Sequence, residues 1–362
     1  MKFFHSAALV AATAAALVAL APSAPAHAQA AKEKCVIANS HYTGWEPIWY
    51  AKESGILKKH SDRNNVEVDV TDPMDYGESI NQFAAGQFCG LAVTNMDALN
   101  GPSAGGVDTT FIVVGDYSNG NDGLLWKAAK KPSLTDIVGK KVVLVEGTVS
   151  QYLLWRGAQI NKFDYNKVKI ENAASETDVK NAFNATGSII VTWNPILMAA
   201  RQEKGAHMLL DSSQIPGEII DGIVVKTGVS DAVKKAIVGA WFETLAVMAD
   251  KGSPKSADAI KWMAGFAGNS VEEFNAQLKT TALFYTPAEA VKFAKDAKLK
   301  ETMDKVRTFA AENGLLKNGV GKEQNKDFVG IQFPDKSVAG NKDNVKLRFD
   351  TTIMEMAADG KL

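Results

Sequence analysis

The chain has 362 residues, of which 46% are hydrophobic and 22% are charged, and its formal net charge at pH 7 is −1. This length suffices for about two domains, and the composition is that of a globular protein with an ordinary hydrophobic core. The near balance of acidic and basic residues leaves no electrostatic footprint for nucleic acid or an anionic membrane surface, so we expect neither as a partner.

The first 30 residues have the pattern of a secretory signal peptide. Lys2 begins a short basic segment, residues 7–20 are apolar and uncharged, and small residues follow at 26–30. The apolar run is too short for a membrane helix, which needs about 20 residues; an uncleaved N-terminal anchor is the alternative. We therefore expect cleavage near residues 28–30 and an exported protein.

The chain has two cysteines, Cys35 and Cys89, and each stands at the start of an expected strand. If these strands are parallel neighbours, a disulfide is geometrically feasible, and export brings the pair into an oxidising compartment. Two buried free thiols are the alternative. The sequence contains no CxxC motif, no HExxH motif and no Cys/His cluster, so we expect no metal site and no cofactor.

Short β-branched runs alternate with amphipathic helical patterns over the first two thirds of the chain, which is typical of α/β folds with parallel strands. The expected strands are residues 35–39, 66–70, 89–93, 110–115, 141–145, 168–171, 188–192 and 222–226. The expected helices between them are residues 47–57, 77–86, 148–160, 176–184 and 194–204.

Residues 230–313 predict successive helices. Ser230, Ser253 and Thr286 are suited to cap three of them, the last two with a proline at the following position. Residues 317–344 are rich in Gly, Asn and Lys and are expected to be irregular, and a short helix is expected around residues 351–358.

Two polar breaks, at residues 115–123 and 211–221, are places where the chain could cross between lobes. Two crossings predict a discontinuous first lobe with a second lobe inserted, as in a hinged clamp. The predicted division is residues 31–120 and 222–315 for lobe 1, 121–221 for lobe 2 and 316–362 for a C-terminal extension.

Several segments resemble a known family of transport proteins. The segments GWEPIWYAKESGIL and DYGESINQFAAGQFCGLAVTNMDAL resemble the first lobe of solute-binding proteins from nitrate/sulfonate/taurine-type ABC importers, and LTDIVGKKVVLVEGTVSQYLLWRGAQ resembles the entry to their second lobe. The resemblance covers roughly residues 35–310. Three shorter segments, TNMDAL, VTWNPIL and DSSQIPGEIID, are similar to the subgroup associated with urea-carboxylase or guanidine-carboxylase gene regions, usually labelled urea importers.

The resemblance implies a two-lobed, type II periplasmic-binding-protein fold, in which each lobe is a mostly parallel sheet flanked by helices and the C-terminal part is helical. It further implies a monomeric periplasmic receptor rather than an enzyme. Such a receptor closes on a small solute and presents it to an ABC permease and its ATPase in the inner membrane.

Ligands of open α/β sheets bind beyond the carboxyl ends of the strands. The residues there are rich in aromatic rings and carboxylates and include no Arg or Lys; Tyr76 is a further aromatic candidate. The predicted ligand-binding residues are Tyr42, Trp45, Asn95, Asp97, Asp116, Tyr117, Asp122, Glu146 and Trp193.

This set suits a guanidinium ion. Guanidinium stays protonated at neutral pH, stacks on Trp or Tyr and donates two hydrogen bonds to one carboxylate. Urea, its neutral isostere, is the second choice because it leaves a buried carboxylate without an opposite charge. An anion would be favoured by the N-terminus of the helix beginning near Thr148, but Glu146 directly before it would repel one.

Each residue also has a simpler explanation. Asp97 could cap a helix, Asp116 and Asp122 could serve a turn, and Glu146 could favour a helix N-terminus. Trp45, Trp193 and the tyrosines could belong to the core.

Three other functions compete with the guanidinium receptor. A receptor for sulfonate- or nitrate-like anions and one for pyrimidines are the first two. The third is a pyrimidine-forming enzyme of the same fold, which uses a pyridoxal-bound Lys and a His. Lys52 and His41 would be its candidates here, but export argues against it and its Cys-rich motif is missing.

Overall fold

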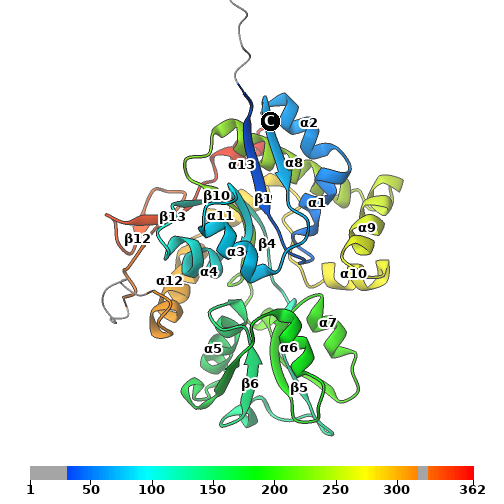
Figure 1. The fold of residues 1–362 in the computed structure, drawn as a ribbon, viewed down its shortest axis with the longest axis vertical. Coiled ribbons are helices and arrows are strands. Elements are labelled where there is room, and N and C mark those ends of the chain that lie inside the picture. Colours follow the sequence, from blue (N-terminus) through cyan, green and yellow to red (C-terminus); the bar gives the residue numbers. More distant parts are fainter. Residues whose placement is uncertain (1–30, 317–324) are drawn as a thin grey trace, which may run out of the picture. The chain divides into compact units, whose positions relative to one another are not determined.

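Two β-sheets, each flanked by helices, make up the fold (Figure 1). The computed structural model describes residues 31–316 and 325–362, and residues 32–362 form one compact unit. The expected signal peptide, residues 1–30, lies outside the described residues.

The larger sheet has eight strands in the order β12-β11-β13-β4-β10-β3-β1-β2. Its strands are β1 (Glu33–Ala38), β2 (Val66–Val70), β3 (Gly90–Thr94), β4 (Thr109–Tyr117), β10 (Ile220–Lys226), β11 (Gly330–Gln332), β12 (Val338–Ala339) and β13 (Val345–Phe349). Strand β1 is parallel to β2 and β3, whereas β10 is inserted antiparallel between β3 and β4. The balance of directions is therefore more even than the mostly parallel arrangement we expected.

The smaller sheet has five strands in the order β7-β6-β8-β5-β9. They are β5 (Asp122–Lys127), β6 (Lys141–Leu144), β7 (Lys169–Asn172), β8 (Ile189–Trp193) and β9 (Ala206–Asp211). Strands β5 and β9 were not expected from the sequence, and β5 pairs antiparallel with both β8 and β9. The chain enters and leaves this sheet through these two strands.

Helices cover both sheets. Around the larger sheet lie α1 (Glu46–Glu53), α2 (Ile56–Arg63), α3 (Tyr76–Ala84), α4 (Asn95–Ala98), α8 (Asp231–Ala249), α9 (Pro254–Phe266), α10 (Val271–Leu278), α11 (Pro287–Ala294), α12 (Ala297–Glu312) and α13 (Thr352–Ala358). Around the smaller sheet lie α5 (Val149–Asn161), α6 (Glu176–Ala182) and α7 (Ile196–Arg201), which occupy the green part of Figure 1. Short π or 3-10 turns are η1 (Leu99–Ser103), η2 (Leu134–Ile137), η3 (Tyr165–Lys167) and η4 (Ser212–Gln214). Among the described residues, none of the helices combines the length and apolarity that a membrane crossing requires.

Local capping chemistry sets several helix ends. The side chains of Ser230, Ser253 and Thr286 each accept a hydrogen bond from a backbone N–H of the first turn, as predicted. The single helix expected at residues 47–57 is instead two helices. Gly55 stands between them with φ of +79°, a left-handed conformation that ends α1 and that glycine adopts without strain.

The C-terminal segment belongs to the larger sheet. Strand β13 lies parallel to β4, and Phe349 stacks on Phe111 at 4.9 Å between ring centroids. The expectation of irregular structure up to residue 344 is wrong for β11 and β12. Both strands are very short, and they are defined by pairing rather than by their own composition: β11 pairs with β13, and β12 pairs with β11.

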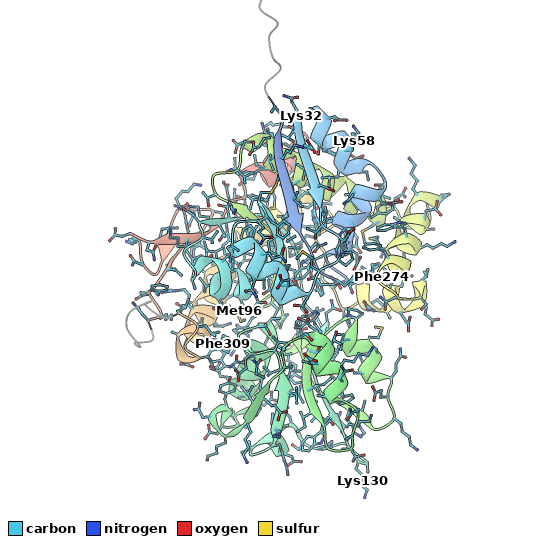
Figure 2. The ribbon with its side chains drawn as sticks, viewed as in Figure 1. Lys32, Lys58, Met96, Lys130, Phe274 and Phe309 are labelled. Carbon is cyan, nitrogen blue, oxygen red and sulfur yellow. A yellow bond between two sulfur atoms is a disulfide. The ribbon has the colours of Figure 1, made fainter. Side chains whose placement is uncertain are left out.

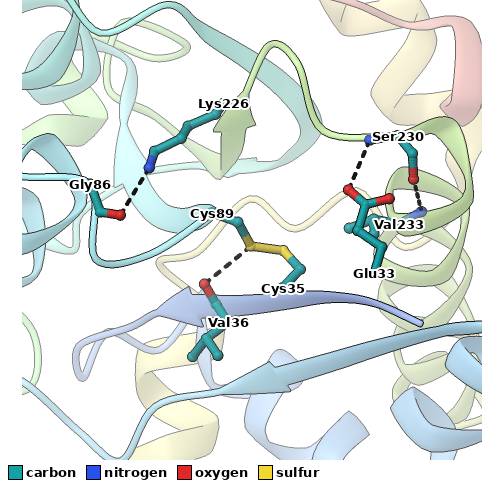
Figure 3. The surroundings of a disulfide bond; sticks show 8 residues. All are labelled: Glu33, Cys35, Val36, Gly86, Cys89, Lys226, Ser230 and Val233. Atoms are coloured by element: carbon teal, nitrogen blue, oxygen red, sulfur yellow. Dashed lines mark hydrogen bonds between the residues drawn. A yellow bond between two sulfur atoms is a disulfide. The ribbon is translucent and has the colours of Figure 1, made fainter. Parts of the chain in front are cut away.

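A disulfide joins Cys35 and Cys89, whose Cα atoms are 5.3 Å apart (Figure 3). The two residues lie on or beside β1 and β3, which are parallel neighbours. The backbone N–H of Cys89 also donates to the carbonyl of Val36 at 3.2 Å, so the covalent link reinforces an existing strand contact.

The two sheets are connected by crossings between β4 and β5 and between β9 and β10. The hydroxyls of Ser118 and Ser212, one from each crossing, are 2.7 Å apart. A third contact is made by α12, whose Phe309, labelled in Figure 2, packs edge-on against Tyr152 of α5 at 5.5 Å. The predicted lobe boundaries fall near the crossings, and the division into lobes stays a prediction.

Candidate ligand-binding site

A small cavity lies between the two sheets, close to both crossings. Its walls are the side chains or backbone of Tyr42, Trp45, Tyr76, Thr94, Asp122, Val149, Trp193, Ile219 and Asp221. The space open to the centre of a water-sized sphere is about 10 Å³, which is about the room that one water molecule needs. As it stands, the cavity has room for no more than about one water molecule, so a ligand of several heavy atoms needs it to open.

Four aromatic rings form a continuous wall of this cavity. Tyr42 packs against Trp45 at 5.0 Å, Trp45 against Tyr76 at 5.3 Å, and Tyr76 against Trp193 at 5.6 Å between ring centroids. All four side chains are buried, and the indole Nε1 of Trp45 has no hydrogen-bond partner. Trp193 comes from the end of β8 and the other three from loops and a helix of the larger sheet, so the wall spans both sheets.

Two carboxylates face each other across neighbouring strands. Asp116 of β4 and Asp221 of β10 occupy opposite register positions and are 0% and 2% exposed. The Tyr42 hydroxyl donates to Asp116 Oδ1 at 3.0 Å, but Asp116 Oδ2 and Asp221 Oδ2 have no partner. A Cβ on Gly44 would lie 2.3 Å from Asp116 Oδ2, so this close approach requires glycine.

Asp97 is a third buried carboxylate, at the start of α4. Its Oδ2 accepts hydrogen bonds from the Tyr76 hydroxyl at 2.7 Å and from the Thr94 hydroxyl at 2.9 Å. Its Oδ1 is buried without a hydrogen-bond partner. The backbone N–H of Asp97 donates to Thr94 Oγ1 at 3.1 Å, which is the helix cap that local sequence predicts.

Asp122, the fourth buried carboxylate, begins β5 and lies opposite Trp193 of β8. Its side chain lines the cavity directly and is 3% exposed. The first residue of the crossing strand thus brings a carboxylate from the smaller sheet to the acids of the larger one.

Burial is the main cause of an upward pKa shift in all four acids. It raises the pKa of Asp97 to about 6 against hydrogen bonds that lower it, and the pKa of Asp122 to about 7. Burial and the charge of Asp122 raise the pKa of Asp116 to about 7. Burial and the charge of Asp116 raise the pKa of Asp221 well above its ordinary value. Among the described residues that line the cavity there is no Lys, Arg or His. Without a cation beside them, Asp97, Asp116 and Asp122 therefore keep their protons to a higher pH than exposed aspartates do, and Asp221 shifts in the same direction.

The structure brings together six of the nine predicted ligand-binding residues. Tyr42, Trp45, Asp122 and Trp193 line the cavity, whereas Asp116 and Asp97 are outside its lining and are hydrogen-bonded to the lining residues Tyr42 and Tyr76. Three others lie elsewhere. Tyr117 follows Asp116 in the same strand, so its side chain points to the opposite face, where it stacks on Phe293 at 5.7 Å.

Asn95 and Glu146 are also outside the cavity lining. The Asn95 side-chain amide binds the backbone of the second crossing. It donates to the carbonyl of Glu218 at 3.1 Å and accepts from the N–H of Ile220. Glu146 is exposed; it lies in the loop between β6 and α5, where its backbone N–H donates to Asn172 Oδ1.

The enzyme candidates are placed elsewhere too. Lys52 donates to the carbonyl of Val70, and His41 contacts Glu46 at 2.8 Å. Neither lines the cavity.

Sequence reasoning missed Asp221 because it assigned residues 211–221 to a polar crossing. Strand β10 in fact begins at Ile220, and Asp221 is its one charged residue before Lys226. A carboxylate inside the apolar run from Ile219 to Val225 was the available indication, because an acid in such a run is buried and needs a reason to be there.

No protein-family model matches the chain, and no curated protein matches it in sequence. Solved structures are similar to it in fold. The periplasmic aliphatic sulphonate binding protein SsuA from Escherichia coli is 16% identical, with a TM-score of 0.65 over 79% of this chain and 94% of that one. The fold is that of the periplasmic binding proteins.

Two further structures with this periplasmic-binding-protein fold extend the comparison. The alkanesulfonate-binding protein SsuA from Xanthomonas axonopodis pv. citri, bound to MOPS, is 13% identical, with a TM-score of 0.63 over 82% of this chain and 97% of that one. A ligand-binding component of an ABC-type import system from Staphylococcus aureus, with zinc bound, is 11% identical, with a TM-score of 0.61 over 90% and 99%. The expected fold class is confirmed, whereas the narrower resemblance to urea or guanidine importers finds no support in these structures.

Among the described residues no group of three or more His, Cys, Asp or Glu is arranged to hold a metal ion.

Proposed function

We propose that this protein is the periplasmic solute-binding component of an ABC importer and that it captures a small planar organic cation, with guanidinium preferred and urea second. The fold it shares with SsuA and with the import-system component from Staphylococcus aureus supports the general class. The cavity supports the choice of ligand.

The observation that carries this choice is the set of unpartnered oxygens around the aromatic wall. Asp97 Oδ1, Asp116 Oδ2 and Asp221 Oδ2 are buried without hydrogen-bond partners. A buried carboxylate oxygen left unsatisfied costs about 1–3 kcal/mol or more. A ligand that brings several N–H donors and a positive charge removes this cost at more than one oxygen.

Guanidinium meets these requirements in a small volume. Its N–H groups lie in one plane and pair with carboxylates in bidentate geometry, while its faces stack on Trp or Tyr for about 2 kcal/mol when desolvated. Urea has the same shape but lacks the charge, so the acids would have to keep their protons when it binds. A sulfonate or nitrate would bring a second negative charge to a site without Lys, Arg or His in its described lining.

Binding is proposed to close the clamp. Residues 31–120 and 222–315 would form one lobe and residues 121–221 the other, with the C-terminal strands β11–β13 attached to the first. The crossings beside Ser118 and Ser212 are the hinge segments of this proposal. The closed, monomeric receptor would then deliver its solute to a membrane permease and its ATPase, without catalysing a reaction.

Calorimetric titration of the purified protein with guanidinium, urea, nitrate, taurine and a pyrimidine tests this proposal. We expect guanidinium to bind tightest and to stabilise the fold by about 2.7 kcal/mol at one hundred times its Kd, without turnover. Asp221→Asn should weaken guanidinium binding at least tenfold, because truncating one partner of a buried charge pair costs about 2–5 kcal/mol.

Glu171→Gln is the matched control. Glu171 is an exposed carboxylate on β7 that pairs with Lys141 at the surface, so its removal should leave the titration unchanged. Tighter binding of nitrate or taurine than of guanidinium, or an equal effect of the two substitutions, would overturn the assignment of the ligand.

A further inference from the structure

One buried amide joins elements of the two sheets beside the cavity. Asn121, the last residue before β5, is 0% exposed. Its Nδ2 donates to the hydroxyls of Tyr42 at 3.2 Å and of Thr281 at 2.6 Å. Its Oδ1 accepts from Asn194 Nδ2 at 2.7 Å and from the Thr280 hydroxyl at 2.6 Å. These bonds use both donors and both lone pairs of the amide, so its orientation is fixed.

The direction of these hydrogen bonds is set at one end by the backbone. The N–H of Met198 in α7 donates to Asn194 Oδ1 at 3.0 Å, and a backbone N–H can only donate. Asn194 must therefore turn its NH₂ group to Asn121, and Asn121 must turn its own NH₂ group to Tyr42. The Tyr42 hydroxyl accepts there, so its single proton is left for Asp116 Oδ1 at 3.0 Å. The chain of hydrogen bonds thus runs one way, from the smaller sheet to a buried acid of the larger one.

The second tyrosine of the aromatic wall is fixed in the same sense by a shorter route. The backbone N–H of Thr94 donates to the Tyr76 hydroxyl at 3.2 Å, and that hydroxyl donates to Asp97 Oδ2 at 2.7 Å. Each of the two tyrosines therefore gives its one hydroxyl proton to an acid outside the cavity lining and has none left for a ligand. Tyr76 is bound directly by a backbone N–H, whereas Tyr42 depends on Asn121.

We propose that Asn121 is a positioning residue of the solute site, which transmits the direction set by the Met198 N–H and makes Tyr42 a permanent donor to Asp116. Asp116 Oδ2 then stays the oxygen that is free for a cation. A solute that carries N–H donors is favoured, because an acceptor-only anion finds no tyrosine proton in the wall. The proposal rests on the proposed function, since Asn121 acts on the same solute site.

The protonation of Asp116 reports which way the Tyr42 hydroxyl points. Burial raises the pKa of Asp116, and the hydrogen bond from Tyr42 works against that rise. The other titratable groups that face Asp116 are Asp122 at the start of β5, Asp221 on β10 and Tyr285 between α10 and α11. Asp116 Oδ2 has no partner among the described residues, so loss of the Tyr42 hydrogen bond should raise this pKa further.

The experiment reverses the chain from its far end. Asn194→Asp replaces the NH₂ group by an oxygen that only accepts when ionised, so Asn121 should rotate its amide and turn Oδ1 to Tyr42. The two threonine hydroxyls bound to Asn121 can each donate or accept, so they can follow this rotation. The Tyr42 hydroxyl should then donate to Asn121 and release Asp116 Oδ1.

Carbon-13 NMR of ligand-free protein with labelled aspartate measures the apparent pKa of Asp116, whose signal is identified by its loss in Asp116→Asn. We expect Tyr42→Phe and Asn194→Asp each to raise this pKa by about 1 pH unit, because a hydrogen bond to a charged group is lost. Combining the two separates direction from added charge: in the Asn194→Asp background, Tyr42→Phe should cause little further change. The pKa of Asp97 is the control within the same spectra and should move much less, because its hydrogen bonds do not pass through Asn121.

Asn121→Asp makes the same reversal one step nearer to Tyr42, since a carboxylate there can only accept the tyrosine proton. It replaces Asn194→Asp if circular dichroism or thermal unfolding shows that the first variant does not fold. Tyr42→Phe should again have little effect in this background. An equal rise caused by Tyr42→Phe in the unchanged protein and in the reversed background overturns the inference, and so does the absence of a rise in the unchanged protein.

A second measurement follows guanidinium binding by calorimetry across pH. The pH above which the affinity levels off should rise by about 1 pH unit in Asn194→Asp, as the pKa of Asp116 does. If guanidinium binds and this pH does not move, Asn121 does not act on the solute and the inference is overturned. If the unchanged protein does not bind guanidinium, the proposed function fails, while the ligand-free titration still decides whether Asn121 directs the Tyr42 proton.

Discussion

Buried acids of two kinds lie where the two sheets meet: one that basic side chains of the protein neutralise, Glu218, and four that they do not. Glu218, in the second crossing, accepts from Arg156 Nε at 2.6 Å, from Lys305 Nζ at 2.9 Å and from the Tyr152 hydroxyl at 2.7 Å. Burial would raise its pKa, but these hydrogen bonds outweigh burial and hold the pKa below its ordinary value. Asp97, Asp116, Asp122 and Asp221, in or beside the cavity, form no ion pair with a basic side chain of the described residues, and burial raises their pKa values.

The comparison teaches how to separate a structural acid from a binding acid. A carboxylate that the chain neutralises with its own Arg and Lys joins two parts of the fold, because Arg156 is on α5 and Lys305 on α12. A carboxylate that the chain buries and leaves unpaired lowers stability, and such a cost is expected at sites that bind something.

The largest effect is expected when the paired group is broken. Arg156→Met removes two hydrogen bonds from Glu218 while keeping much of the side-chain volume. The free energy of unfolding, measured by urea denaturation, should fall by about 3 kcal/mol, because a buried acid loses its main partner. Lys141→Met, which breaks a surface pair with Glu171, is the control and should change it by less than about 1 kcal/mol. Equal losses would remove the distinction between the two groups.

The pH dependence of stability should have two limbs, one from each group. A raised folded-state pKa means that the native aspartates bind more protons than the unfolded chain between about pH 4 and pH 7. The free energy of unfolding of the ligand-free protein should therefore decrease as pH rises from about 5 to 8.

Glu218 acts in the opposite direction. Its folded-state pKa is lowered, so its contribution is present above its ordinary pKa and is lost as pH falls through the folded-state value. Unfolding curves across pH should show a maximum near pH 5, and Arg156→Met should reduce the loss on the acid side. A stability that rises steadily from pH 5 to pH 8 would contradict the assignment of unpaired acids.

Guanidinium affinity should also depend on pH. If the cation replaces one proton held by the aspartates, its Kd should decrease by up to tenfold for each pH unit between about pH 5 and pH 7. Urea carries no charge and should show no such slope. Calorimetry in two buffers with different protonation enthalpies measures the released proton directly, and its absence would contradict proton exchange.

The smallest effect is expected from one neutral substitution in the unpaired group. Asp116→Asn keeps the acceptor for the Tyr42 hydroxyl but removes a charge that faces Asp221 across the strands. Since like charges opposite each other destabilise a sheet, the ligand-free protein should gain about 1 kcal/mol at pH 8 and less at pH 5. The same variant should bind guanidinium more weakly. We therefore expect one substitution to raise stability and to lower affinity. A destabilised variant at pH 8 would argue that this acid is structural.

Local sequence determined much of this protein. Helix caps at Ser230, Ser253 and Thr286 act within a few residues, so the pattern alone predicts them. Apolar alternation and strand ends were enough to find the α/β class and to name six residues that the structure gathers in or beside one cavity, because side chains beyond the carboxyl ends of strands lie at one edge of a sheet. Their role in binding stays a prediction.

Only the tertiary structure decided which acids are paired. Asp116 and Tyr117 are neighbours in β4, so their side chains point to opposite faces of the sheet. Asp221 was missed because β10 was expected to start at residue 222. That Asp116 faces Asp221 depends on the register between β4 and β10, which are distant in sequence. Strands β11 and β12 exist because β13 pairs beside β4 and leaves an edge for them. The charge of a site depends on side chains from several elements that come together only on folding. A sequence analysed segment by segment finds the carboxylates. It does not show that Arg156 and Lys305 neutralise Glu218 while no such partner among the described residues lies beside the aspartates.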